Sequence, residues 1–189
     1  MNFFLSDTHF YDQKCLGYDG RPFVSVESMN ETIIKNWNRV VTPEDTVYLL
    51  GDFSYGRGGD VVSISQRLAG HKILIRGNHD TGTELNYAFE KISDYLELVT
   101  EDGILVLCHY PIASFKDMQK RGTVHLYGHV HNSYEAKICA DVYSKLNKIK
   151  GYQIEAYNVG VMQPYMAYTP RTLPEIRKLV MQYPLDFSH

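Results

Sequence analysis

The sequence predicts an α/β fold, on three observations. Short apolar runs of strand length recur along the 189 residues, and segments with helical spacing of apolar residues lie between most of them. The connections between these segments are short. Alternation of this kind is typical of layered α/β architectures. We expect one domain over residues 1–189, which is long enough to bury a substantial core.

Five apolar runs are predicted strands. Most are continuous rather than alternating, which suits strands buried on both faces. They are Phe3–Leu5, Thr46–Leu50, Lys72–Ile75, Ile104–Cys108 and Val124–Tyr127.

A helix is predicted from Val26 to Val40, because apolar residues recur there with the spacing of one helical face. Ser28 and Glu31 have the spacing of a capping box at its start. The sequence therefore predicts an amphipathic helix after the first strand.

Three further helices are predicted from their capping signals. Asp60 is placed to cap a helix that Gly70 ends, and Thr83 to cap one that continues through Ile92. Thr172 begins a capping box near the C-terminus. The lysine-rich segment 133–151 predicts a loop or a short helix, followed by a strand at Tyr152–Val159.

Composition excludes several classes of protein. The net charge of -3 gives no general basic field for nucleic acid, and no run approaches the roughly 18 apolar residues of a membrane span. The three cysteines are odd in number and widely spaced, which favours free thiols in a reducing compartment. The N-terminus lacks the pattern of a secretory signal. We therefore expect a cytoplasmic protein; its oligomeric state is not predicted.

Metal-binding side chains follow each of the five predicted strands. Ligands of open α/β sheets bind at the carboxyl ends of strands, so these fragments are expected to meet at one rim. The fragments are Asp7-Thr8-His9, Gly51-Asp52, Gly77-Asn78-His79-Asp80, His109 and Gly128-His129-Val130-His131.

These side chains suit two adjacent divalent metal ions. Carboxylate and amide oxygens with neutral imidazoles fit Mn²⁺, Fe, Zn²⁺ or Co²⁺, and the absence of thiolates argues against a closed structural zinc site. The pairs Asp7-x-His9 and His129-x-His131 each place two side chains on one face of an extended segment. A two-metal site is suited to phosphoryl chemistry.

The five fragments, in this order, resemble the blocks of the calcineurin-like metallophosphoesterase superfamily: D-x-H, G-D, G-N-H-[DE], a lone His and G-H-x-H. All five blocks are present between residues 7 and 131, about two-thirds of the chain. Shorter features, such as Arg21-Pro22-Phe23, are similar to small bacterial and phage phosphoesterases. The loop after Asp52 departs from the protein Ser/Thr phosphatase pattern, which argues against that activity.

The resemblance implies a four-layer α/β/β/α sandwich with a dimetal site at its rim. It implies that Asp52 bridges both metals and that the other ligands divide between them. Metal-bound hydroxide would attack phosphorus in line, and His79 would protonate the departing alkoxide. The implied ligands are Asp7, His9 and His131 for one metal, and Asn78, His109 and His129 for the other.

Three more residues are candidates for the site. Arg21 and Arg57 are candidate phosphate contacts, because a guanidinium can pair two phosphate oxygens. Asn78 is a further candidate to contact substrate. Asp80 would orient His79 or support its loop.

Other residues receive no functional role from the sequence. His71, His125 and His189 lie outside the blocks, and the 15 tyrosines are scattered with no evident stacking surface. Asn158 follows a predicted strand and is more consistent with a turn than with the site.

The sequence therefore predicts a dimetal phosphoesterase acting on phosphomonoesters or phosphodiesters. Its expected partner is a phosphate-ester substrate, and nucleotides are among the candidates. A nucleotide pyrophosphohydrolase or a nuclease with the same centre is an alternative. A non-catalytic scaffold is another, against which the complete ligand set argues.

Overall fold

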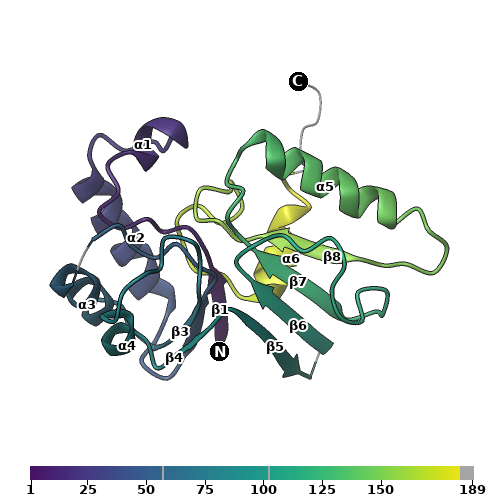
Figure 1. Cartoon of the computed structure of the whole chain (residues 1–189), viewed down its shortest axis with the longest axis horizontal. Coiled ribbons are helices and arrows are strands. Elements are labelled where there is room, and N and C mark those ends of the chain that lie inside the picture. Colours follow the sequence, from purple (N-terminus) through teal and green to yellow (C-terminus); the bar gives the residue numbers. More distant parts are fainter. Residues whose placement is uncertain (57, 102, 184–189) are drawn as a thin grey trace.

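The computed structural model describes residues 1–56, 58–101 and 103–183, and it contains two four-stranded sheets (Figure 1). The first sheet is wholly parallel, and its strands lie in the order in which they occur in the chain. Its strands are β1 (Asn2–Leu5), β2 (Thr46–Leu49), β3 (His71–Ile75) and β4 (Lys91–Ser93).

The second sheet also keeps the chain order, but its first pair is antiparallel and the other pairs are parallel. A parallel bridge between Ser6 and Gly160 links the ends of the two sheets. The strands of the second sheet are β5 (Tyr95–Thr100), β6 (Gly103–Cys108), β7 (Thr123–Tyr127) and β8 (Glu155–Asn158).

The main core lies between the two sheets. Leu105 and Leu107 of β6 pack in the same buried cluster as the residues of β1, β2 and β3, whereas Val106 between them packs in a second, smaller cluster. Successive side chains of a strand point to opposite faces, so one face of β6 meets the first sheet and the other faces outward. This explains the continuous burial of the apolar runs.

Helices cover the outer face of the first sheet. The longest is α2 (Val26–Val40), whose fully buried Met29, Ile33 and Trp37 extend the same buried cluster to the outer side of the first sheet. Shorter helices lie beside it in Figure 1. They are α1 (Cys15–Tyr18), α3 (Gly59–Gln66) and α4 (Leu85–Ala88).

A single helix, α5 (Tyr134–Leu146), covers the outer face of the second sheet in the described part of the chain (Figure 1). Its Tyr143 packs with Val106 and Tyr127 in the smaller cluster. The helix α6 (Leu173–Val180) follows and contacts β1. The layers are therefore helices, sheet, sheet and helix, which confirms the predicted α/β sandwich.

Several local predictions need correction. The cap of α2 is Ser25, which exchanges hydrogen bonds with Ser28, while Glu31 pairs with Arg67. Asp60 lies in the first turn of α3 and does not cap it.

The helix predicted from Thr83 through Ile92 is only four residues long. Phe89 turns to extended backbone, because the next residues form β4 against β3. The segment 133–151, predicted as a loop or a short helix, contains the thirteen-residue helix α5.

In the described residues, no helix is both long and apolar enough to cross a bilayer. The three cysteines are free thiols, with Cys15 and Cys108 buried.

Candidate metal centre

The predicted ligands gather at one rim because each follows a strand whose carboxyl end reaches that rim. The five connecting segments come from β1, β2 and β3 of the first sheet and from β6 and β7 of the second. These segments carry the predicted metal ligands and the predicted proton donor: Asp7, His9, Asp52, Asn78, His79, His109, His129 and His131.

Five of these residues have a backbone that L-amino acids rarely adopt. Asp7, His9, Asp52, His129 and His131 all have φ between 46° and 68°. Such a left-handed conformation costs roughly 1–3 kcal/mol for a non-glycine residue, and it persists only where the surrounding structure imposes it. The backbone at this rim is therefore strained, and the strained conformation sets the direction of these side chains.

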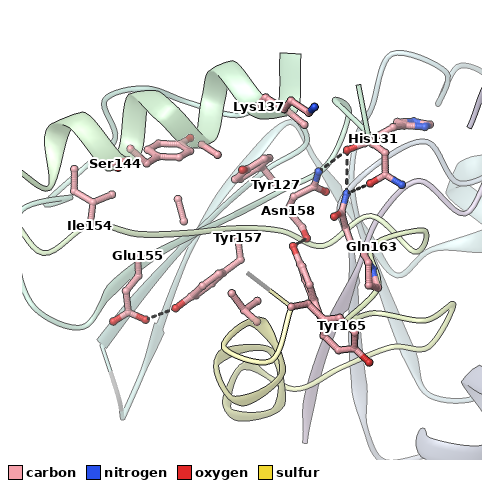
Figure 2. A pocket seen from close by; sticks show the side chains of 18 of the residues that line it. Tyr127, His131, Lys137, Ser144, Ile154, Glu155, Tyr157, Asn158, Gln163 and Tyr165 are labelled. Atoms are coloured by element: carbon pink, nitrogen blue, oxygen red, sulfur yellow. Dashed lines mark hydrogen bonds between the residues drawn. The ribbon is translucent and has the colours of Figure 1, made fainter. Parts of the chain in front are cut away.

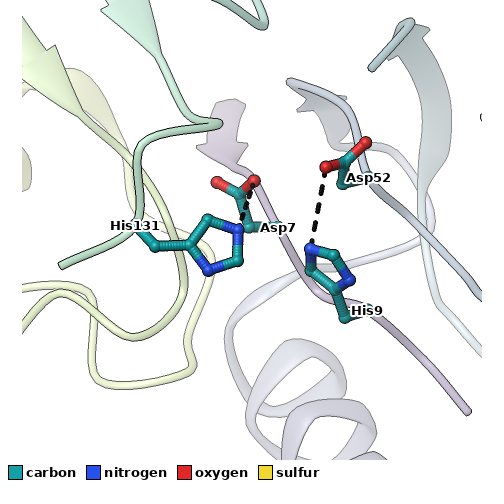
Figure 3. Close-up of side chains that lie close together, drawn as sticks. All are labelled: Asp7, His9, Asp52 and His131. Atoms are coloured by element: carbon teal, nitrogen blue, oxygen red, sulfur yellow. Dashed lines mark ion pairs between the residues drawn. The ribbon is translucent and has the colours of Figure 1, made fainter. Parts of the chain in front are cut away.

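The side chains form two groups with ligand atoms within 4.8 Å of one another. The first contains Asp7, His9, Asp52 and His131 (Figure 3), and the second contains Asp52, His109 and His129. Asp52 is common to both.

One carboxylate oxygen of Asp52 faces both groups. Its Oδ2 lies 3.7 Å from Nε2 of His9 and 3.4 Å from Nε2 of His109. The other oxygen, Oδ1, accepts the backbone N–H of His79 at 2.9 Å, which fixes the carboxylate. Asp52 is thus held in the position of a bridging ligand.

Asn78 lies on the side of the second group. Its Oδ1 is 3.2 Å from Nε2 of His109 and 3.0 Å from Nδ1 of His129. The amide oxygen is therefore placed to complete the second set of ligand atoms.

The buried imidazoles are oriented by partners on the other ring nitrogen. Nδ1 of His109 donates to the carbonyl oxygen of Leu50 at 2.7 Å, and Nδ1 of His9 lies 3.2 Å from Asp12 Oδ2. Such outer contacts fix the tautomer and leave Nε2 with its lone pair toward the centre. Asp12 was not predicted, although its position three residues after His9 is a usable signal.

His131 is braced from several sides. Its Nδ1 lies 3.0 Å from Asp19, and its backbone oxygen accepts hydrogen bonds from Asn158 at 3.0 Å and Gln163 at 2.9 Å (Figure 2). The other end of the Asn158 amide accepts the N–H of Gly160, so Asn158 is both a turn residue and a support for His131. Asp19 and Gln163 have no sequence signal, because they lie far from His131 in the chain.

Glycines in the blocks permit the segments to approach closely. A Cβ on Gly77 would collide with the backbone nitrogen and the carboxylate of Asp52, and one on Gly128 with the carboxylate of Asp7. Each of these glycines thus makes room for a ligand from another block.

The electrostatics of the site reflect its buried carboxylates. Burial acts to raise the pKa of Asp7, but His131 and the other nearby histidines outweigh it and hold that pKa well below its usual range. Burial also acts to lower the pKa of His131, but Asp19 and Asp7 raise it to about 10. By contrast, burial lowers the pKa of His9 to about 4. The carboxylates create a negative field that favours cations.

The residues present fit divalent metal ions. Nε2 of His9 is buried and has no hydrogen-bond partner, yet it faces the carboxylate of Asp52. A buried polar atom without a partner is costly, and a cation between these two groups would satisfy both. The donor set of oxygens and imidazole nitrogens also suits Mn²⁺, Fe, Zn²⁺ or Co²⁺.

His79 stands beside the two groups, at the boundary of two cavities. One cavity of about 570 Å³ is also lined by His9, Asp52, His129 and His131. His79 also lines a smaller cavity of about 240 Å³. His79 can therefore reach a molecule held at the centre.

Asp80 holds together the loops that follow β2 and β3. Among the described contacts, its side chain makes none with His79. Its carboxylate accepts backbone N–H groups of Asp52, Phe53 and Gly77 at 2.8–2.9 Å. Burial raises its pKa. Asp80 is thus a positioning residue; of the two roles predicted for it, these contacts favour support of the loop over orientation of His79.

Arg21 is buried, and its guanidinium is bonded to groups of the chain itself. Its guanidinium donates to the backbone oxygens of Asp7 and Thr8 at 2.9 and 3.1 Å and to Asp19 at 2.8 Å. These contacts argue against the predicted phosphate contact and make Arg21 a brace for the first block. Arg57 lies outside the described residues.

Three exposed tyrosines border the centre, although no sequence pattern groups them. The Tyr110 ring centroid lies 4.6 Å from that of His129, that of Tyr18 5.9 Å from His131, and that of Tyr55 5.2 Å from His79. Each comes from a different connecting segment. Only the folded chain brings them together.

The fold and the site together define a class: α/β sandwiches whose strand ends carry a cluster of aspartate, asparagine and histidine arranged for two metal ions. The chain matches the calcineurin-like phosphoesterase superfamily domain over residues 2–170, and it belongs to that superfamily. Members of this superfamily are phosphoesterases and typically bind divalent metals.

Three similar proteins have names that state no activity. An uncharacterized protein of Methanocaldococcus jannaschii is 32% identical over 181 residues, which cover 94% of this chain and 90% of that protein. The gene 66 protein of Mycobacterium phage L5 is 39% identical over 71 residues, or 35% of this chain and 34% of that protein. A crystal structure of AQ665, a protein of unknown function from Aquifex aeolicus, has a TM-score of 0.72 and 30% identity, covering 95% of this chain and 98% of its own.

Proposed function

We propose that this protein hydrolyses phosphomonoesters or phosphodiesters at a dimetal centre. The observation that carries the proposal is the pair of ligand groups that share Asp52, with His79 beside them. Asp7, His9 and His131 would hold one metal ion, Asn78, His109 and His129 the other, and Asp52 both. When bound, the metals would polarise the attacking water and offset the charge of the phosphate.

The chain's own residues account for the remaining steps. Water forms a new P–O bond while the P–O bond to the leaving group breaks, and the surplus proton of the water passes to solvent. His79 donates a proton to the departing oxygen, so that an alcohol rather than an alkoxide leaves. His79 then regains a proton from solvent. Its place beside Asp52, to which its backbone N–H is bonded, keeps it at the edge of the reacting centre.

The test compares hydrolysis of p-nitrophenyl phosphate and bis(p-nitrophenyl) phosphate with added Mn²⁺, together with the metal content of the purified protein. Asp52→Asn preserves the shape of the side chain but removes its charge, and it should lose at least one metal and nearly all turnover. Asp141→Asn on the exposed side of α5 is the matched control and should change neither. If neither ester is hydrolysed and no metal binds, a scaffold role is favoured instead.

The role of His79 has its own test. His79→Ala should keep both metals, yet slow the hydrolysis of esters with poor leaving groups by roughly 10²–10⁴-fold. The effect on p-nitrophenyl esters should be much smaller, because nitrophenolate leaves without a proton. Full activity of this variant on an alkyl ester would contradict the proposed proton donor.

A further inference from the structure

A cavity of about 240 Å³ is lined in part by His79, and its lining includes none of the first group of predicted ligands. Tyr55 and His79 line this cavity at the side of the metal centre. Val61 and Leu85, which are both buried, give it apolar surface. Glu84 also lines it. This size suits one ring-bearing group rather than a whole substrate.

Tyr55 offers an aromatic face at this cavity. Its ring centroid is 5.2 Å from that of His79 with 48° between the ring planes, and the residue is 48% exposed. Its backbone N–H donates to the oxygen of Phe10 at 2.7 Å, next to the bridge between Phe10 and Ser54. The backbone that carries the ring is therefore anchored to the first block of the centre.

The cavity lies where a leaving group would go. His79 and Asn78 line both this cavity and the larger one that contains the predicted metal ligands. If His79 donates its proton to the departing oxygen, the group attached to that oxygen must lie beside His79. This cavity is therefore a space beside His79 that can receive that group, and Asn78 is the one predicted ligand among its lining residues.

Glu84 restricts the charge of such a group. Its carboxylate accepts the N–H of Gly58 at 3.3 Å and lines the same cavity. A carboxylate there disfavours a second negative charge on the leaving group. A leaving group that carries its own phosphate would meet this repulsion.

We propose that this cavity, which we call the Tyr55 slot, binds an uncharged leaving group that carries a flat aromatic ring, such as a nucleoside or a benzyl alcohol. Stacking on tyrosine tolerates many rings because each presents a π face. The inference rests on the proposed function, since it names the leaving group of that reaction. It argues against pyrophosphate cleavage, in which the leaving group is itself anionic.

The experiment uses two phosphodiesters whose leaving groups are similar in size but differ in aromaticity: methyl benzyl phosphate and methyl cyclohexylmethyl phosphate. The quantity is the ratio of kcat/KM for release of the ring-bearing alcohol from the Mn²⁺-loaded protein. We expect the wild type to favour the benzyl ester about tenfold. Tyr55→Leu should bring the ratio near one, and Tyr55→Phe, which keeps the ring, should retain it. Tyr95→Leu, on a strand of the other sheet, is the control and should not change the ratio.

Binding is measured separately, by calorimetry with benzylphosphonate and cyclohexylmethylphosphonate, which cannot be hydrolysed. The two readouts distinguish the two proposals. If the protein hydrolyses both esters equally and binds both phosphonates equally, the phosphoesterase function stands and the Tyr55 slot is overturned. If it hydrolyses neither ester but binds benzylphosphonate more tightly through Tyr55, aromatic binding in the Tyr55 slot is supported, whereas the phosphoesterase function and the leaving-group role of the slot are overturned.

The charge preference is tested with methyl 4-carboxybenzyl phosphate against the benzyl ester. The wild type should disfavour the carboxylated ester, and Glu84→Gln should reduce that preference by up to about fivefold, the scale of a solvent-exposed charge pair. An unchanged preference in Glu84→Gln would overturn the role of this carboxylate.

Discussion

The two sheets of this protein support their outer helices very differently. On the first sheet, α2 buries six residues, among them Met29, Ile33 and Trp37. On the second sheet, α5 buries only Tyr143, and a cavity of about 770 Å³ lies between α5, β8 and the segment that follows β8 (Figure 2). Close packing is therefore concentrated in the first sheet and in the core between the sheets.

Both sheets nevertheless contribute to the same centre. The first supplies Asp7, His9 and Asp52 from short segments that leave well-packed strands, and the second supplies His109 and His131. In the second sheet, hydrogen bonds replace part of the missing packing. The amides of Asn158 and Gln163 hold the backbone at His131 at the edge of the 770 Å³ cavity. Ligand geometry can thus be maintained by a polar brace where apolar packing is loose.

The largest expected effect is on the free energy of unfolding, which we compare for one aromatic residue from each outer layer. Trp37 is fully buried, and its Nε1–H donates to the oxygen of Ala69 at 2.9 Å, so Trp37→Ala should cost about 4 kcal/mol of unfolding free energy. Tyr143 lines the cavity and already lacks neighbours on that side, so Tyr143→Ala should cost about 2 kcal/mol, including its hydrogen bond to Ile112. Urea unfolding of both variants gives the comparison. Equal losses would show that the two outer layers are packed equally well.

The second expected effect concerns pH and is confined to the second sheet. His125 is fully buried; Nδ1 donates to the oxygen of Val106 at 2.9 Å and Nε2 accepts the N–H of Ile112 at 3.1 Å. Burial lowers its pKa to about 4, below the 6.5 of the unfolded chain. The unfolded state therefore binds a proton first as the pH falls, and stability that is complete above about pH 6.5 decreases until about pH 4.

Over that range, His125 should account for a loss of about 3 kcal/mol. His125→Gln offers an amide donor and acceptor without a titrating group, so the variant should lose correspondingly less stability between pH 7 and pH 4. Unfolding curves of the metal-free proteins at several pH values measure the difference. Parallel pH dependence in both proteins would show that His125 does not stay neutral in the fold.

The same contrast explains which parts of the fold were predictable. Buried parallel strands such as β2 and β3 appear in the sequence as continuous apolar runs. The helix α2 follows from its apolar spacing, although the predicted cap, Ser28, lies three residues after the observed cap, Ser25. The strand β5, Tyr95–Thr100, mixes apolar and polar residues because it is only half-buried at a sheet edge, and it was missed. The lysine-rich α5 was not clearly predicted as a helix, since it buries little apolar surface.

The candidate site likewise contains residues that the sequence predicts and residues that it does not. The residues proposed to hold metal were found because they follow strands in short blocks, which are local patterns. The partners that orient them depend on contacts between distant segments, as with Asp19 beside His131. Arg21 shows the opposite error: a guanidinium suits a phosphate and a backbone oxygen alike, and only its burial shows which it contacts. Tyr55 likewise acquires significance only through its distance from His79.

The smallest expected effect tests whether the contrast extends to the starts of the helices. At α2, Ser25 and Ser28 bond reciprocally to each other's backbone N–H, so Ser25→Ala should cost about 1 kcal/mol. At α5, the hydroxyl of Ser133 donates to the Glu135 carboxylate at 2.9 Å and does not cap the helix, so Ser133→Ala should change stability by less than about 0.5 kcal/mol. Both values come from urea unfolding. A similar cost at both positions would mean that the outer layers differ in packing alone, and that α5 is as well specified at its start as α2.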